Sequence, residues 1–180
     1  MDALAEILRR LDNLIMPGTI AEVDHQAARC RVRIGELTTA PLRWFSLRAG
    51  TTSDWSPPSD GEQCVVFSPG GEPAAGFVLV GLYSDDNPPP SDSATNSSRR
   101  YPDGAVITYD HQSHALTATL PADGKVIVQA PAGFQLVGDL DVTGTLTASV
   151  DVVAAGVSLV EHPHGGVQPG TGQSDRPVPT

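Results

Sequence analysis

Aromatic and basic residues are scarce in this 180-residue chain. Aromatic residues make up 5% of it, and 11 lysines and arginines stand against 21 acidic residues, which gives a formal net charge of -10. Clustered aromatic side chains form the stacking platforms for single-stranded nucleic acid, and clustered basic side chains bind phosphate backbones. The only aromatic candidates for such a platform are Trp44, Phe45 and Trp55, and we interpret Trp44 and Phe45 as residues that fill the core or its contact with neighbours. We therefore expect no nucleic acid among the partners.

Long apolar runs are also missing. No stretch of 18 apolar residues occurs, and Arg9 and Arg10 interrupt the apolar residues near the start. The sequence therefore lacks the patterns of a membrane-spanning helix and of a secretory signal peptide. We expect a chain that is made as a soluble protein in the cytoplasm.

Catalytic signatures are absent as well. The sequence contains no Gly-x-Ser-x-Gly or HExxH pattern. Its acidic residues fall on alternating solvent-facing positions or in turn-rich segments, whereas a glycosidase needs two carboxylates held across a cleft. We predict that the protein is not an enzyme.

The two cysteines, Cys30 and Cys64, both lie inside apolar strand patterns. A free thiol in such a place behaves as a small apolar side chain. We expect two buried thiols, with a single disulfide between them as the alternative.

Glycine and proline are abundant, with 18 and 16 residues. Together with the low aromatic content, this favours short strands and many turns, and the fold class we predict is all-β with a short N-terminal helix. The helix is expected within residues 1–17, because apolar residues at spacings of three and four extend over residues 2–15, and Pro17 and Gly18 are expected to end it. Its apolar stripe must pack either on its own domain or on a copy of itself.

Residues 18–84 are expected to form a small barrel of the OB type. Five strand-like segments, separated by turn-rich stretches, occur at 18–24, 28–34, 42–48, 62–68 and 74–83. The second segment alternates Cys30, Val32 and Ile34 with three arginines, which predicts one buried and one solvated face. Residues 85–100 are rich in proline, serine and aspartate, and we interpret them as a linker.

Residues 101–160 are expected to be a second β domain. Strand-like runs occur at 104–109, 114–120 and 125–130, and residues 134–152 then alternate apolar even positions with polar odd positions. The apolar phase slips by one after Ala154, which predicts a bulge or turn near Gly156. No helical segment is available to cover the apolar face, so we expect three identical chains to intertwine as a triple-stranded β-helix.

Residues 161–180 are either a metal-binding tip or a short polar tail in which the pair of histidines is incidental. His162 and His164 are separated by one residue, so their side chains point to the same side of an extended chain. A pair of this kind is a weak motif alone, but in a trimer six imidazoles would converge on one axis. Zinc prefers four ligands, so six nitrogens favour iron or nickel.

Several segments resemble one known family. These segments are Arg29-Cys30-Arg31-Val32, Trp44-Phe45-Ser46-Leu47-Arg48-Ala49-Gly50, Gly61-Glu62-Gln63, Gly81-Leu82-Tyr83-Ser84, Asp86-Asn87-Pro88, Tyr101-Pro102-Asp103-Gly104-Ala105-Val106-Ile107 and His162-Pro163-His164-Gly165-Gly166. Over residues 1 to about 170 the chain is similar to the phage baseplate assembly protein V family, the central spikes of P2-like contractile tails and R-type pyocins.

This resemblance implies a homotrimer with an OB-fold that attaches to the tail hub, an intertwined β-helix, and an apex that holds one iron ion per trimer by His162 and His164 of each chain. It implies a structural spike that pierces the outer membrane of a bacterium when the sheath contracts. The expected location is the tail baseplate of a virion or pyocin particle, after synthesis in the host cytoplasm. An OB-type module for oligosaccharide or nucleic acid and a tail-associated cell-wall hydrolase are the alternatives.

Overall fold

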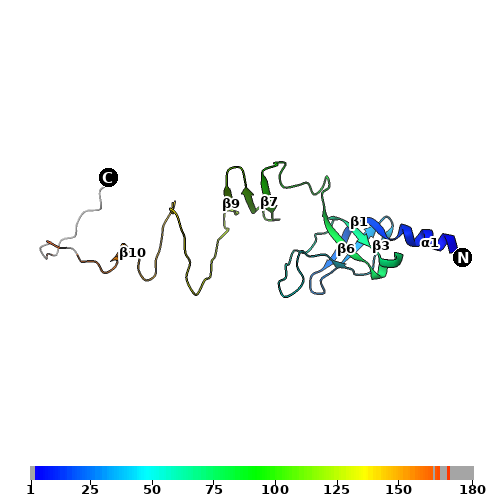
Figure 1. Cartoon of the computed structure of the whole chain (residues 1–180), viewed down its shortest axis with the longest axis horizontal. Coiled ribbons are helices and arrows are strands. Elements are labelled where there is room, and N and C mark those ends of the chain that lie inside the picture. The colour runs from blue at the N-terminus through cyan, green and yellow to red at the C-terminus, as the bar shows by residue number, and fades with distance from the viewer. Residues whose placement is uncertain (1–2, 164, 167–169, 171–180) are drawn as a thin grey trace. The chain divides into compact units, whose positions relative to one another are not determined.

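A computed structural model describes residues 3–163, 165–166 and 170. The chain divides into two compact units, Met1–Val126 and Ile127–Thr180, each of which is described by itself. Within the described residues, no helix has the length and apolar character needed to cross a membrane. Figure 1 shows one short helix, a curled sheet and smaller β elements, in agreement with a mostly β fold.

The first unit begins with helix α1 (Ala3–Asp12) and strand β1 (Ile15–Asp24). Pro17 and Gly18 therefore lie inside a strand, and the expectation that they end the helix is wrong. The backbone of Gly18 lies against the side chain of Val32 in the neighbouring strand, where a Cβ atom would overlap it. This close approach explains the glycine, and the fixed φ of proline is compatible with an extended strand.

The remaining strands of the first sheet are β2 (Arg29–Ile34), β3 (Leu37–Thr38), β4 (Arg43–Trp44), β5 (Gln63–Phe67) and β6 (Phe77–Leu82). The strand order is β3-β2-β1-β5-β6-β4, and β4 pairs with β6 in parallel. Cys30 of β2 and Leu42, next to β4, exchange two backbone hydrogen bonds of 2.9 and 2.8 Å. Strand β2 is thus joined to the segment beside β4, at the other end of the order, and the sheet curls into a barrel that fits an OB domain.

The barrel encloses a small aliphatic core. Its buried members are Ile20, Cys30, Val32, Leu42, Cys64, Val66 and Val78. Both cysteines are free and buried, so the prediction of buried thiols is confirmed. Burial raises the pKa of Cys30 to about 11 and that of Cys64 to about 12, because a thiolate is poorly solvated inside an apolar core.

Two short 3₁₀ helices, η1 (Pro69–Gly71) and η2 (Pro73–Ala75), connect β5 to β6. The structure therefore begins this strand at Phe77, whereas the sequence pattern had placed its start at residue 74. Prolines at the first position of each 3₁₀ helix favour the helical φ and cost no hydrogen bond.

A second, three-stranded antiparallel sheet completes the first unit. It contains β7 (Asn96–Arg100), β8 (Val106–Asp110) and β9 (Ala115–Thr119), in that order. Strand β7 occupies the last five residues of the segment interpreted as a linker. Its sequence, Asn-Ser-Ser-Arg-Arg, contains no apolar residue, so backbone pairing with β8 and a hydrogen bond between the hydroxyls of Ser98 and Thr108 hold it instead.

Residues 120–152 are described throughout, and they contain no regular strand in the single chain. A strand at 125–130 was expected and is not formed there. The second unit has one hairpin, β10 (Val153–Ala154) and β11 (Val157–Ser158). Ala155 and Gly156 connect these strands with φ angles of 50° and 81°, which confirms the turn predicted near Gly156.

Candidate functional site

The segment after β11 holds the first of the two candidate metal ligands. The Nδ1 atom of His162 lies 2.7 Å from the backbone oxygen of Ser158. A carbonyl oxygen accepts only, so Nδ1 carries the proton and the neutral imidazole has its lone pair on Nε2. Metal-binding histidines commonly donate one ring N–H to a backbone carbonyl in this way, which fixes the tautomer and the orientation of the ring.

Hydrogen bonds from the hairpin hold this segment in place. The hydroxyl of Ser158 accepts from the backbone N–H groups of Val160 and Glu161, at 3.1 and 2.8 Å. The carboxylate of Asp151 accepts from the N–H groups of Val152 and Val160, at 2.8 and 3.2 Å. The pKa of Asp151 is lowered, chiefly by a hydrogen bond from the Ser158 side chain. The turn that carries His162 is therefore ordered by its own chain.

His164, the second candidate ligand, lies outside the described residues. Within the part of the chain that the structure describes, no group of three or more His, Cys, Asp or Glu side chains converges on one point. Two histidines from one chain are also fewer ligands than a transition metal takes. The pair alone therefore does not fill the coordination sphere of such an ion.

The alternating segment that precedes the hairpin exposes a series of large apolar side chains. In the single chain they are all solvent-exposed: Phe134, Leu136, Leu140, Val142, Leu146 and Val150. The intervening positions include Asp139, Asp141 and Asp151, so the two faces of the segment differ sharply in polarity. Many exposed large apolar side chains along one segment favour an interaction surface there.

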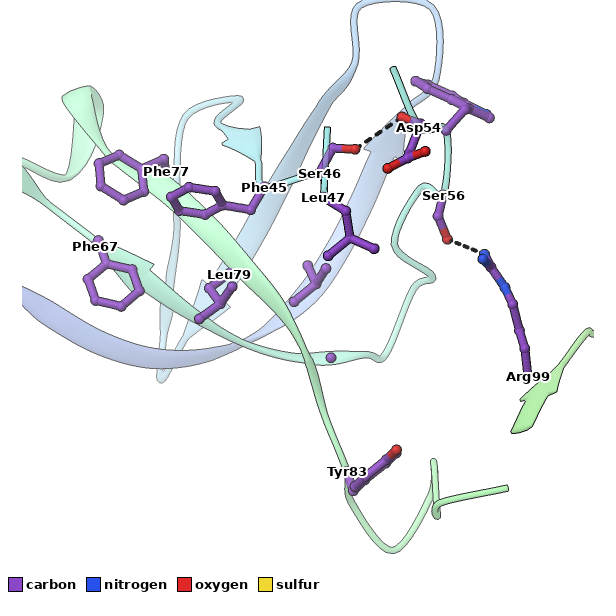
Figure 2. Close-up of a pocket in the computed structure, with 13 residues that line it drawn as sticks. Phe45, Ser46, Leu47, Asp54, Ser56, Phe67, Phe77, Leu79, Tyr83 and Arg99 are labelled. Carbon is purple, nitrogen blue, oxygen red and sulfur yellow. Dashed lines mark hydrogen bonds between the residues drawn. The ribbon is translucent and has the colours of Figure 1, made fainter. Parts of the chain in front are cut away.

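A third feature is an aromatic groove of about 1230 Å³ in the first unit. Figure 2 shows Phe45, Phe67 and Phe77 gathered on one side and Arg99 and Ser56 on the other. Phe77 stands edge-on to Phe45, with ring centres 5.2 Å apart, and stacks on Phe67 at 5.7 Å. The guanidinium of Arg99 donates to the hydroxyl of Ser56 at 2.8 Å and so connects β7 to the loop that follows β4.

The groove is poor in groups for catalysis. Asp54 is the one carboxylate among its lining residues, whereas acid–base hydrolysis of a glycoside needs two. The sequence had suggested Trp44 and Phe45 as barrel-filling or contact residues. Trp44 is half-buried against the core, and Phe45 lies in the groove with half of its surface exposed.

Most of the residues that form the groove were not predicted from the sequence. Phe67, Phe77, Tyr83 and Arg99 come from separate segments, and the parallel pairing of β4 with β6 brings Phe45 beside Phe77. No local sequence pattern predicts a parallel strand pairing that is only two residues long. The one available signal was the concentration of the few aromatic residues in the first half of the chain.

Comparisons with known proteins find two matching regions in the chain. Residues 16–83 match the type VI secretion system/phage-baseplate injector OB domain, and residues 156–178 match the GpV apex motif. The chain is 44% identical over 134 residues to the spike protein of Escherichia phage P2. That alignment covers 71% of this chain and 64% of the P2 protein, so the chain spans less than two thirds of this relative's length.

Proposed function

The chain belongs to the phage baseplate V family, and from this premise we propose that it forms the central spike of a contractile tail baseplate. In this proposal it acts as a homotrimer. Its OB domain joins the tail hub and other baseplate proteins, and its apex is the first part to enter the target membrane. The particle is a virion or a pyocin. The activity is mechanical, and no catalytic step is part of it.

The observation that carries the proposal is the uncovered apolar face of residues 134–152. An isolated chain leaves these side chains in water, at a cost of about 25 cal/mol for each Å² of apolar surface. Three chains wound about one axis would bury all three apolar faces against one another and pair every strand edge. The absence of strands in this segment of the single chain fits a structure whose backbone partners belong to other chains.

An intertwined trimer also suits the mechanical task. Sheath contraction would drive the spike into the outer membrane of the target bacterium, so the tip must keep its shape under load. A chain that is hydrogen-bonded to two neighbours cannot leave without breaking both sets of bonds. Resistance to forced unfolding is governed by the unfolding rate, which such entanglement lowers.

At the apex, the proposed ligands of a single iron ion are His162 and His164 from each of three chains. The contact between His162 and Ser158 supports this assignment, because it presents Nε2 as the nitrogen with the lone pair. When bound, the ion would cross-link the three chain ends, where fraying would otherwise begin. The GpV apex motif over residues 156–178 supports a specialised tip at this position.

Sedimentation mass together with metal analysis of the same sample tests the proposal. A mass of about three times 18.8 kDa is expected, with one iron ion per three chains. A monodisperse monomer would contradict the intertwined spike, and a trimer without metal would contradict the apex alone. Loss of piercing can then be scored by assembling tails with a trimerisation-defective variant and measuring killing of the target cells.

A further inference from the structure

Helix α1 presents an uncovered apolar face. None of its residues is buried, and Leu4, Ile7, Leu8 and Leu11 are 61%, 61%, 50% and 59% exposed. The sequence left two occupants for this stripe, its own domain or a copy of itself. The structure excludes the first, because the stripe does not pack on the barrel.

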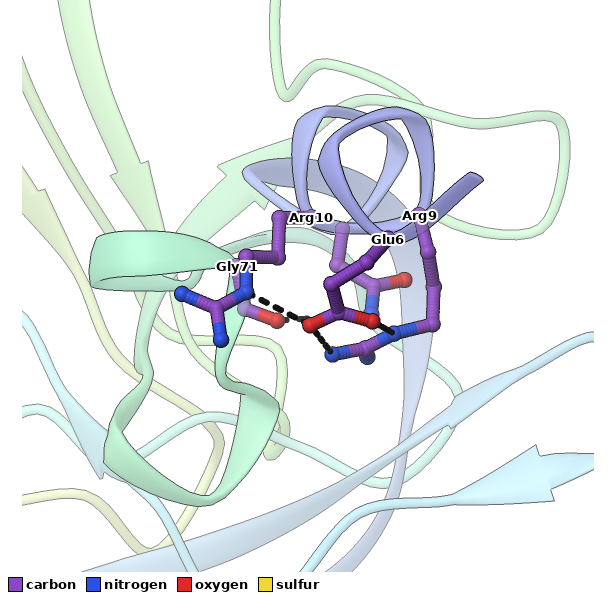
Figure 3. Close-up of polar contacts among 5 residues, drawn as sticks. Glu6, Arg9, Arg10 and Gly71 are labelled. Atoms are coloured by element: carbon purple, nitrogen blue, oxygen red, sulfur yellow. Dashed lines mark hydrogen bonds and ion pairs between the residues drawn. The ribbon is translucent and has the colours of Figure 1, made fainter. Parts of the chain in front are cut away.

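The helix is nevertheless fixed to the barrel at its C-terminal end. The backbone of Arg10 lies directly against Gly71 of η1, and the side-chain amide of Asn13 donates to the Gly71 oxygen at 3.4 Å. Figure 3 shows this contact beside the ion pairs of the helix. The barrel therefore fixes the C-terminal end of α1, and the side chains of Ile7, Leu8 and Leu11 are exposed.

Three charged side chains of α1, those of Glu6, Arg9 and Arg10, pair with one another. The carboxylate of Glu6 accepts from Arg9 at 2.9 Å and from Arg10 at 2.6 Å. These hydrogen bonds lower the pKa of Glu6 to about 2. Arg9 and Glu6 lie on the side of the helix opposite the apolar stripe, so no charge interrupts the face that a partner would contact.

The spacing of the stripe indicates which partner fits. Leu4, Ile7 and Leu11 are three and four residues apart, which is the spacing of a, d and a positions of a heptad. Leu8 adds a third apolar position, which makes the stripe wider than a two-stranded seam requires. A wide aliphatic stripe without charges is complementary to copies of itself in a bundle of three.

We propose that the α1 helices of three copies pack together by this stripe and form a short three-helix bundle ahead of the barrels. This inference rests on the trimer of the proposed function. A helix of ten residues is marginal alone, but a trimer holds three copies at high effective concentration. The bundle would hold the three chains together near their N-termini, whereas the apex lies near their C-termini.

Cysteine cross-linking of the full chain tests the bundle. Ile7→Cys places a thiol at a position that faces the bundle axis, and Arg9→Cys places one on the outer face as the matched control. The native thiols of Cys30 and Cys64 are buried, so they do not compete. Mild oxidation is expected to shift Ile7→Cys to a reducible covalent dimer on a denaturing gel, and to leave Arg9→Cys at the mass of a single chain.

Sedimentation of the same samples before oxidation separates the possible outcomes. A trimer in which Ile7→Cys does not cross-link, or cross-links no better than Arg9→Cys, overturns the bundle and leaves the spike intact; the stripe would then be assigned to a hub protein. A monomer overturns the bundle and the proposed spike together.

Discussion

Gly71 of η1 lies so close to Arg10 of α1 that a Cβ atom on residue 71 would overlap the Arg10 backbone. Gly71 also has a φ of +70°, a conformation that side chains with a Cβ atom rarely adopt. This contact and the amide of Asn13 fix the end of the helix to the barrel.

Gly71→Ala is therefore expected to destabilise the first unit and to displace α1. The left-handed backbone alone costs about 1–2 kcal/mol, and the overlap adds to it. Gly70→Ala is the matched control, because Gly70 has a φ of +66° and open space around its Cβ position. Urea unfolding should show a larger loss of stability for Gly71→Ala. Equal losses of stability for the two variants would mean that the contact with Arg10 does not contribute to the free energy of unfolding.

The buried thiols make stability fall at alkaline pH. The folded-state pKa values of Cys30 and Cys64 are about 11 and about 12, whereas an exposed thiol titrates near pH 8.5. Between these values the unfolded chain has released protons that the folded chain still holds, so the free energy of unfolding decreases as pH rises from about 8.5 to about 11. Below that window the thiols stay protonated in both states and contribute no pH dependence.

Urea unfolding at several pH values across this window measures the effect. The double variant Cys30→Ala and Cys64→Ala should be less stable at neutral pH, because it leaves cavities in the core, but its stability should fall less steeply with pH. An equally steep fall would assign the pH dependence to other groups. The native thiols should also react with a thiol reagent only after unfolding.

The sequence predicted those parts of the fold that depend on local alternation. Cys30 and Val32 were assigned to the core because they alternate with arginines, and both are buried. Strand β7 was missed because Asn96–Arg100 has no apolar residue, and its order comes from pairing with β8. Pro17 and Gly18 were misread because the strand around them depends on β5 and on the side chain of Val32, which are distant in the sequence.

The candidate sites show the same contrast between local signals, which the sequence reveals, and tertiary contacts, which it does not. His162 was found from its spacing to His164, which is a local signal. Its hydrogen bond to Ser158 depends on the turn at Ala155 and Gly156 and was not predicted. The groove around Phe77 was missed because it is assembled by tertiary pairing of β4, β5 and β6.

The faces of the alternating segment can be tested by a pair of substitutions. Val142→Asp would bury three unpaired charges near the trimer axis and should abolish assembly, whereas Thr143→Asp should have little effect. In a single chain Val142 is already half exposed, so the barrel of the Val142→Asp variant should still fold. Sedimentation gives the trimer yield, and tryptophan fluorescence reports the barrel. Equal trimer yields for the two variants would mean that the faces are assigned wrongly.

The apex is tested by removing its ligands. His162→Ala together with His164→Ala should remove the metal and loosen the residues around the hairpin, while the trimer persists because its own apolar axis holds it. Ser158 also contributes, but its contact with His162 is a backbone carbonyl, so Ser158→Ala keeps that hydrogen bond and removes the hydroxyl contacts to Val160 and Glu161. This variant should bind metal more weakly than the unmutated chain and more strongly than the double histidine variant.

Elemental analysis of the unmutated trimer, purified without chelators, decides between the possible sites. One iron ion per three chains agrees with six imidazoles around one ion, and one metal ion per chain would indicate a separate four-coordinate site. Absence of bound metal would contradict the proposed site.

Acidification offers a second test of the apex. Because a protonated imidazole has no lone pair for a metal, the bound ion should be released as the solution is acidified through the range in which imidazoles titrate. Proline disfavours helical backbone at the residue before it, so Pro163 favours an extended conformation at His162, and Pro163→Gly should weaken metal binding while both ligands remain in place.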